Sequence, residues 1–410
     1  MNLFNKLKSQ FSNKPLDRER FGAFIASELK KRGADAEYQA EAYRVRINYS
    51  SGPLVWSLQQ PFTLYCEAIP EKRDVILERQ ITAMAMGAAI PDSLDETVKS
   101  RLVADLKPIG QVWAAAAGSW QGSMPRFIDG PLLLPGVVPS VVLDLPASKV
   151  RVPAGQAKAW GATEESLFQI GLANLRAASA DKWIPLGENL VRSGWHDDYD
   201  AARAQFHDLV HRAPIEGERV IAIPTRNDLF VASGRDSAAI ADMMKRAFEA
   251  WDKSQFRLSI WPYQLTDGGY VRYDLPSALA VEAGSRQKQL DAQTYQHQAT
   301  VLAKLHPDMA FPNPILMRRQ ADAKLISAVH WLQVKAALPR TDLLAFTMTR
   351  PNAESQQIRV LWEDAEAILG GFVRFQDTEP ARYEMPLEIS GEKAVQLLEA
   401  STRADAWMNA

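Results

Sequence analysis

The sequence predicts an α+β protein of two to three domains, with small mixed or antiparallel sheets and helices packed on one face. The first observation is length, because 410 residues at about 150 residues per domain correspond to roughly 2.7 domains. The second is composition, since 47% hydrophobic and 23% charged residues suit a packed core and exclude a disordered, collagen-like or coiled-coil chain. The third is pattern, because short alternating stretches separated by turns stand beside runs with helical spacing.

Residues 1–88 are predicted to form an N-terminal α+β domain. Asp17 caps a helix of recurring apolar residues that ends at Gly33. Tyr43 to Tyr49 alternates apolar and polar side chains, which predicts a half-buried strand with Leu54 to Leu58 as its partner. A second long helix is predicted from Pro61 to Met86.

Residues 89–130 are predicted to be a linker or an insertion. Helical signals run from Leu94 to Leu106 and are broken at Pro108. The following stretch from Val112 to Trp120 is apolar but has no clear period, so no element is assigned to it.

Residues 131–284 are predicted to form a second α+β domain. Its helices are expected to begin at the capping residues Thr163 and Asp236. The remaining predicted elements are strands at Val141–Leu145, Val220–Ile223, Leu229–Ala232, Phe256–Pro262 and Tyr270–Tyr273, and a helix over Asp198–Val210. Arg226 to Asp228 is read as the turn of a hairpin between Val220–Ile223 and Leu229–Ala232.

Residues 285–410 are predicted to form a C-terminal α+β extension. A helix rich in glutamine and alanine is expected over residues 285–304, followed by a proline-broken loop. Strands are expected at Leu325–Leu332, Leu343–Thr349, Gln357–Trp362 and Phe372–Phe375, and a last helix from Ser390.

Charge and cysteine content exclude several classes of partner and site. The 47 basic and 49 acidic residues give a net charge of −2, which argues against nucleic acid as a partner. The single cysteine, Cys66, excludes an internal disulfide framework and a cysteine-built metal site. A buried structural role is expected for Cys66, because Glu67 and Glu71 do not favour a thiolate.

The chain is expected to be cytoplasmic and to have no membrane span. Its first residues have no apolar core of the secretory type, and no run of about 18 apolar residues occurs. Leu3, Phe4, Leu7 and Phe11 would share one face of a short helix, which is read either as a surface anchor or as a helix that docks on its own domain.

One cluster of polar residues is a candidate catalytic site. His196, Asp198, Asp200 and Arg203 lie within eight residues, and an imidazole beside carboxylates and a guanidinium can perform acid–base chemistry. The alternative is structural, with Asp198 or Asp200 as helix caps and Asp200 paired with Arg203. No cofactor is predicted, because the chain contains no P-loop, no G-x-G-x-x-G and no nucleophile elbow.

The other candidate residues are metal ligands and binding residues. His207 and His211 are four residues apart and would share a helix face, as metal ligands or as a solvated surface. Trp195 lies in a predicted loop and is a candidate contact with a partner.

Five pieces in order resemble the YtpQ-like family of bacterial proteins. They are Val142–Pro146, Trp160 with Thr163–Glu165, Ala173–Arg176, Asp198–Arg203 and Ile221–Pro224 with Asp228–Val231. The resemblance covers about residues 15–275, also through Tyr43–Ile47 and Tyr65–Arg79, and leaves residues 285–410 as an extension. The family has no established activity, but its pattern adds Asn174 and Arg176 as candidate binding residues beside Asp200 and Arg203.

The function expected from these observations is non-enzymatic binding, with a protein as partner or, alternatively, a small molecule. An alternative is a hydrolase or nucleotide-handling enzyme that uses Asp198, Asp200 and Arg203, with His196 as base. These groups should converge in a pocket if the enzyme hypothesis holds. A further alternative is a toxin-immunity protein.

Overall fold

The computed structural model describes residues 15–49, 52–86, 90–118, 124–145, 148–319, 322–349, 355–375, 378–386 and 389–409. The chain divides into two compact units, each built from separate stretches of sequence. Unit 1 comprises Met1–Ala104, Arg126–Asp129 and Ser140–Asn174, and unit 2 comprises Asp105–Pro125, Gly130–Pro139 and Leu175–Ala410. Residues 131–284, predicted as one domain, therefore contribute to both units. The predicted N-terminal anchor helix lies outside the described residues.

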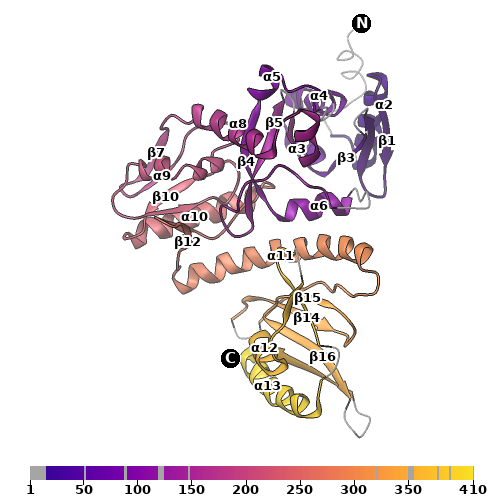
Figure 1. The fold of residues 1–410 in the computed structure, drawn as a ribbon, viewed down its shortest axis with the longest axis vertical. Helices are drawn as coiled ribbons and strands as arrows, with labels where there is room; N and C mark the ends of the chain where they lie inside the picture. Colours follow the sequence, from indigo (N-terminus) through magenta and orange to yellow (C-terminus); the bar gives the residue numbers. More distant parts are fainter. Residues whose placement is uncertain are drawn as a thin grey trace. The chain divides into compact units, whose positions relative to one another are not determined.

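The α+β class is confirmed in both units (Figure 1). In unit 1, α2 (Arg18–Lys31) packs on the antiparallel sheet β1-β2-β3, whose strands are Asp35–Gln39, Arg44–Tyr49 and Gly52–Ser57. Asp17 caps α2 as predicted, because its Oδ1 accepts a hydrogen bond of 2.8 Å from Arg20 N. The apolar faces of helix and sheet share one core.

The single helix predicted from Pro61 to Met86 is wrong, because two helices occupy this stretch. They are α3 (Gln59–Glu67) and α4 (Pro70–Met86). The chain is extended at Ala68, with φ −70° and ψ 142°, and Pro70 then begins α4. A proline lacks the N–H that a helix interior needs but is favoured at the first helical position.

The helix predicted from Leu94 to Leu106 is also wrong. Only α5 (Glu96–Lys99) is helical, and β4 (Leu102–Pro108) follows it in a sheet of order β4-β5-β6 with Val137–Leu145 and Ser148–Arg151. Leu102, Ala104 and Leu106 are buried alternately, which is the period of a strand and not of a helix. The apolar stretch without a period is also helical, as α6 (Gly110–Gly118).

The helices α7 (Ala154–Ala159) and α8 (Glu164–Ala177) complete the core of unit 1. Thr163 caps α8 as predicted: its Oγ1 accepts from Ser166 N at 3.0 Å, and Thr163 N donates to Ser166 Oγ at 3.2 Å. Gly171 lets α8 approach β4 closely, because a Cβ there would lie 2.9 Å from Ala104 N.

Unit 2 contains a six-stranded antiparallel sheet of order β12-β11-β9-β10-β8-β7. In chain order its strands are Trp183–Gly187, Leu190–Ser193, Arg219–Ala222, Phe230–Ser233, Tyr263–Thr266 and Gly269–Arg272. The helix α10 (Ser237–Lys253), capped by Asp236 as predicted, packs on it. The predicted hairpin is β9-β10, whereas the predicted strand Phe256–Pro262 is wrong and forms only an isolated bridge at Arg257.

The helix predicted over Asp198–Val210 is a third correction. A 3-10 helix, η1 (Ala201–Gln205), and a short α-helix, α9 (His207–His211), replace it. Asp198 has a left-handed φ of 67°, which a right-handed helix excludes. Phe206 breaks the second half with φ −101° and ψ 86°.

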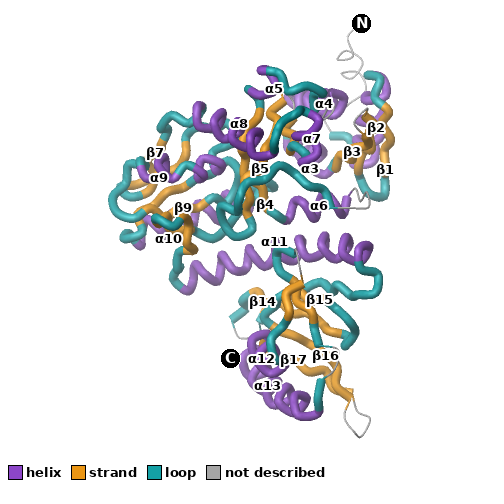
Figure 2. Tube along the Cα trace, in the orientation of Figure 1, coloured by secondary structure: helices purple, strands orange, loops and turns teal. Residues whose placement is uncertain are grey.

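The C-terminal part of unit 2 begins with the long helix α11 (Ser277–Leu305). The sheet β13-β14-β16-β17 follows, with strands Ile315–Arg318, Leu325–Trp331, Leu343–Thr349 and Ser355–Leu361, and β14 pairs with β16 in parallel. A smaller sheet β15-β19-β18 is made of Ala337–Pro339, Arg382–Glu384 and Val373–Phe375. Figure 2 shows α12 (Trp362–Leu369) and α13 (Gly391–Asn409) beside the larger sheet, and both helices contact β17.

One core cluster joins α6 to the C-terminal part. Trp113 and Ala116 of α6 are buried with Val301 and Leu302 of α11 and with Phe311. The Trp113 indole N–H also donates to Glu379 O at 3.2 Å. A segment predicted as linker therefore supplies core side chains to unit 2.

Candidate functional site

Arg203, a candidate catalytic residue, is fully buried and has no exposed surface. Its two Nη atoms donate to the Asp197 carboxylate at 2.9 and 2.6 Å, and its Nε donates to Ser179 Oγ at 2.9 Å. Nη2 also lies 3.2 Å from Ala178 O, and the guanidinium carbon lies 4.5 Å from the centroid of the Trp195 ring. Arg203 therefore pairs with Asp197, whereas the structural alternative had predicted a pair with Asp200. Its hydrogen bonds fix the loop that carries these residues.

The other members of the predicted cluster line neither of the two described cavities. Asp200 is fully buried, and its Oδ1 accepts from His196 N at 3.3 Å while its Oδ2 accepts no hydrogen bond from the described residues. Asp198 forms an ion pair with Arg226 at 3.4 Å. Burial raises the pKa of Asp228, and the nearby Asp200 carboxylate adds to the rise. Sequence reasoning placed Asp228 only in a turn.

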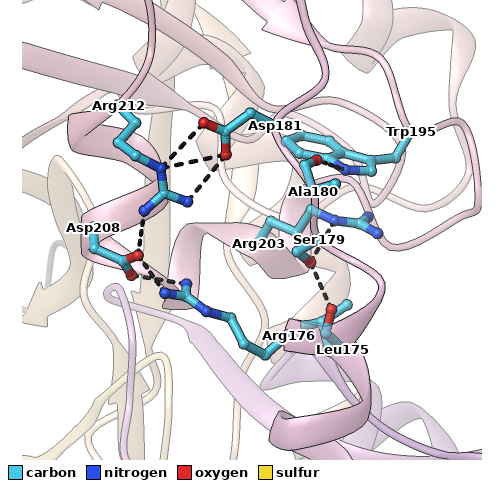
Figure 3. A network of polar contacts seen from close by, with 9 residues as sticks. All are labelled: Leu175, Arg176, Ser179, Ala180, Asp181, Trp195, Arg203, Asp208 and Arg212. Atoms are coloured by element: carbon cyan, nitrogen blue, oxygen red, sulfur yellow. Dashed lines mark hydrogen bonds and ion pairs between the residues drawn. The ribbon is translucent and has the colours of Figure 1, made fainter.

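The predicted binding residues Trp195 and Asn174 are engaged with their own chain. Trp195 is 8% exposed, and its indole N–H donates to Ala180 O at 2.7 Å (Figure 3). Asn174 belongs to unit 1, where its amide donates to Lys99 O at 2.7 Å and to Leu102 O at 2.9 Å. The indole of Trp195 and the amide of Asn174 both donate to backbone carbonyls, so these contacts stabilise the fold.

Arg176, the third predicted binding residue, belongs to a network of ion pairs at the surface (Figure 3). Its guanidinium donates two hydrogen bonds to Asp208, and Arg212 bridges Asp208 to Asp181. The hydrogen bond from Arg176 holds the pKa of Asp208 well below its usual range, against a smaller rise from burial and with further help from Arg212. These side chains are between 42 and 49% exposed, so salt screens the pairs.

The candidate metal ligands His207 and His211 lie on α9. Burial lowers the pKa of His207, and the neighbouring His211 lowers it further. The His207 ring meets Tyr270 edge to face at 5.0 Å between centroids. In the part of the chain that the structure describes, no group of three or more His, Cys, Asp or Glu side chains is placed to hold a metal ion.

Unit 2 contains a cavity of about 610 Å³, in the size range of sites for small molecules. Its walls come from five parts of the chain: the start of α6, Pro135 with Gly136, the loop after α10 with the β11-β12 hairpin, one face of α11, and Glu379–Pro380. A shallower cavity of about 480 Å³ adjoins it along α11 and shares Arg257 and Gln293 with it. Neither cavity is lined by any of the residues that the sequence singled out.

Two arginines line one side of the larger cavity. The Arg257 Nε donates to Trp251 O at 3.0 Å, and among the described residues its two terminal nitrogens have no hydrogen-bond acceptor. The Arg272 guanidinium stacks on the Trp261 ring, 3.4 Å from its centroid. Arg272 also lies opposite Tyr263 in the β11-β12 register, and both line the cavity. These contacts hold two positive charges at the cavity.

One face of α11 forms a polar wall of the cavity. Gln287, Asp291, Thr294 and His297 all line the cavity and recur at intervals of three or four residues, so they lie along one side of the helix. Asp291 Oδ1 accepts from Gln287 Nε2 at 2.8 Å, and burial raises the pKa of this carboxyl to about 6. Burial lowers the pKa of His297, which favours the neutral form of its imidazole.

The fold holds these walls together by close packing and by one buried arginine. A Cβ at Gly110 would lie 2.7 Å from Thr294 Oγ1, so glycine allows the first turn of α6 to meet α11. Arg382 is fully buried and donates to Gln298 Oε1 at 3.0 Å and to Tyr295 O at 2.8 Å, which fastens the chain beyond Pro380 to α11.

Sequence reasoning missed this site because its parts are distant in sequence. Arg257 lies in a stretch that was predicted as a strand, and Asp291 and His297 lie in a helix that was noted only for its glutamine and alanine content. Gly110 lies just after the predicted break in the helical signals at Pro108. The one local signal was the glutamine-rich face of that helix. No family model matches the chain, and neither a curated protein nor a solved structure matches it.

Proposed function

We propose that this protein is a non-enzymatic binding protein that holds a small polar molecule in the cavity of unit 2. The observation that carries the proposal is the cavity of about 610 Å³ whose walls present two arginines, the half-buried carboxyl of Asp291 and several amide and hydroxyl groups. A few convergent polar groups in a preformed cavity are the usual construction of a ligand site.

The arrangement of the predicted catalytic residues supports binding over hydrolysis. Arg203 is buried under its own hydrogen bonds, Asp198 pairs with Arg226, and neither residue lines a described cavity. A nucleophile or general base must reach a substrate within hydrogen-bond distance. The enzyme hypothesis required these groups to converge in a pocket, and none of them lines either described cavity, which favours the binder.

A small molecule is also favoured over a protein as the ligand. The expectation of a protein partner depended on Trp195, whose indole is buried and hydrogen-bonded within the chain. No helix of the described residues is long and apolar enough to cross a membrane. Membership of the YtpQ-like family, a cytoplasmic location and the toxin-immunity alternative stay predictions.

A thermal-shift screen tests the proposal. The compounds are amino acids and short peptides, carboxylic acids, phosphate esters, amines and neutral sugars, and we expect one class to raise the melting temperature, since a ligand that binds only the folded state stabilises it. Gln293 is an exposed residue of α11 that lines the cavity, so Gln293→Trp should block the shift. Gln169→Trp, at an exposed position of α8, should not.

Two outcomes would contradict the binding function. One is a screen in which no class of compound shifts the wild-type protein. The other is a shift that persists unchanged in Gln293→Trp, because the ligand would then bind elsewhere.

A further inference from the structure

Two arginines at the cavity have no carboxylate partner among the residues that the structure describes. Many arginines of this chain form ion pairs with a carboxylate, including Arg151, Arg203 and Arg286. Arg257 and Arg272 line the cavity, and the described residues provide neither of them with an ion pair. A planar guanidinium presents two parallel N–H groups to a carboxylate. The unpaired arginines therefore suit an anionic group of a ligand.

The cavity also contains a negative charge that lacks a cationic partner. The Asp291 carboxylate accepts a hydrogen bond from the neutral Gln287, and no ion pair joins it to Arg257 or Arg272 among the described residues. The charged group that acts on it is Glu379, which has the same sign and is itself paired with Arg374 at 3.0 Å. A buried carboxylate without a counter-ion is unfavourable. An ammonium group in the cavity would remove this cost.

These two observations together define the ligand's chemistry. Resting on the proposed binding function, we propose that the cavity binds a small zwitterion of the amino acid or short-peptide type. Its carboxylate would pair with Arg257 and Arg272, and its ammonium with Asp291. Arg257 comes from the loop after α10, Arg272 from β12 and Asp291 from α11, so the two charges of the ligand meet side chains from different elements.

The neutral groups of the walls suit the rest of such a ligand. Gln287 and Thr294 supply amide and hydroxyl groups on α11, and the first turn of α6 adds Gln111. Peptide groups are bound by donors and acceptors of this kind. A cavity of about 610 Å³ has room for more than one amino acid residue, so short peptides are included in the class.

Isothermal titration calorimetry on the full chain tests the proposal. The probes are the common amino acids and a panel of dipeptides, and the tightest of them is then compared with its N-acetylated and its C-amidated form. Each modification removes one charge, and we expect each to weaken binding by at least about tenfold. If the acetylated and amidated forms bind as tightly as the zwitterion, the proposal is overturned.

Two variants assign each charge to its wall. Asp291→Asn should bind the zwitterion and the N-acetylated probe equally, because it no longer recognises the ammonium. Arg257→Gln should discriminate less strongly against the amidated probe than wild type does, because Arg272 remains beside the carboxylate. The matched controls are Asp242→Asn and Arg246→Gln, an exposed ion pair on α10 at 3.0 Å, and both should bind as wild type.

Proton release gives a readout that a structural role alone would not produce. An ammonium beside Asp291 stabilises its ionised form, so binding near pH 6 should release protons, visible as a dependence of the heat on the buffer. This release should vanish in Asp291→Asn, and its presence there would overturn the assignment. If other classes bind and no zwitterion does, this inference fails while the binding function stands, whereas no binding at all removes the function itself.

Discussion

Arg203 and Arg257 show that one residue type has two different uses in this chain. Arg203 is fully buried, and each of its nitrogens has an acceptor, among them both oxygens of Asp197. Burial raises the pKa of Asp197, but its hydrogen bonds and ion pair with Arg203 outweigh burial and leave the pKa below its usual value. Of the Arg257 guanidinium nitrogens, only Nε forms a hydrogen bond with the part of the chain that the structure describes. The first arginine therefore stabilises a loop, and the second is available to a ligand.

The variant Arg203→Lys tests the first role. Lysine keeps the charge but cannot form the planar fork that reaches Asp197 and Ser179 together. We expect a loss of about 3 kcal/mol in the free energy of unfolding, at the low end for a broken buried pair because Asp197 is 38% exposed. Urea unfolding measures this loss. Arg212→Lys, in an exposed network, should cost less than about 1 kcal/mol, and equal losses in both variants would contradict the assignment.

The variant Asp291→Asn tests the effect of burial on the cavity carboxyl. The pKa of Asp291 is about 6 in the folded chain against an ordinary value of 3.8, so the folded state binds more protons than the unfolded state between these values. Wild-type stability should therefore fall as pH rises from about 4 to 6, by at most about 3 kcal/mol. The variant lacks this loss, so its stability relative to wild type should rise over the same range.

Urea midpoints measured from pH 4 to 8 check the Asp291 prediction. Asp242→Asn serves as control, because Asp242 is an exposed carboxylate on α10. A constant difference between wild type and Asp291→Asn across this range would show that the carboxyl is not buried as described.

At the scale of the element, local signals predicted those helices that follow a capping residue. Asp17, Thr163 and Asp236 each begin a helix as expected, because a side-chain oxygen accepts from a backbone N–H of the first turn. The hairpin β9-β10 was predicted for a similar reason, since its turn and its alternating strands are close in sequence. These elements are specified by the residues within them.

The variant Thr163→Ala tests one of these local signals. It removes the oxygen that accepts from Ser166 N, and we expect a cost of about 1 kcal/mol in the free energy of unfolding. Thr163→Ser keeps that oxygen and should cost almost nothing. Chemical denaturation followed by circular dichroism distinguishes the two, and similar losses would show that the methyl group and not the cap stabilises α8.

Elements that depend on distant partners could not be predicted in this way. The strand β4 was read as helix because the helical signals that begin at Leu94 were continued to Leu106, whereas its pairing with β5 in the sheet makes it a strand. The loop that carries Asp198 and Arg203 was predicted as helix because no neighbouring residue indicates that Asp198 adopts a left-handed φ of 67°. The cavity was missed for the same reason, because its arginines and Asp291 meet only after folding.

At the scale of the molecule, neither compact unit is continuous in sequence. Trp113 of α6 is packed with Val301, Leu302 and Phe311, all of which belong to the predicted extension or its helix. Residues 285–410 therefore contribute to the core that includes α6, and they also supply one wall of the cavity. A binding experiment on a chain that lacks residues 285–410 would therefore not separate a loss of binding from a loss of folding.

A chain ending at Gly284 tests this dependence. Removing residues 285–410 strips Trp113 of its core neighbours, and the loss should exceed the roughly 3–5 kcal/mol expected for Trp113→Ala in the full chain. Hydrogen exchange read peptide by peptide should show that α6 loses its protection. Peptides of α2 and α4 should keep theirs, because the core that contains them is built from residues 16–85 alone. If α6 stays as protected in the shortened chain as in the full one, residues 285–410 form an independent domain. The cavity wall that they provide would then not depend on a core shared with α6.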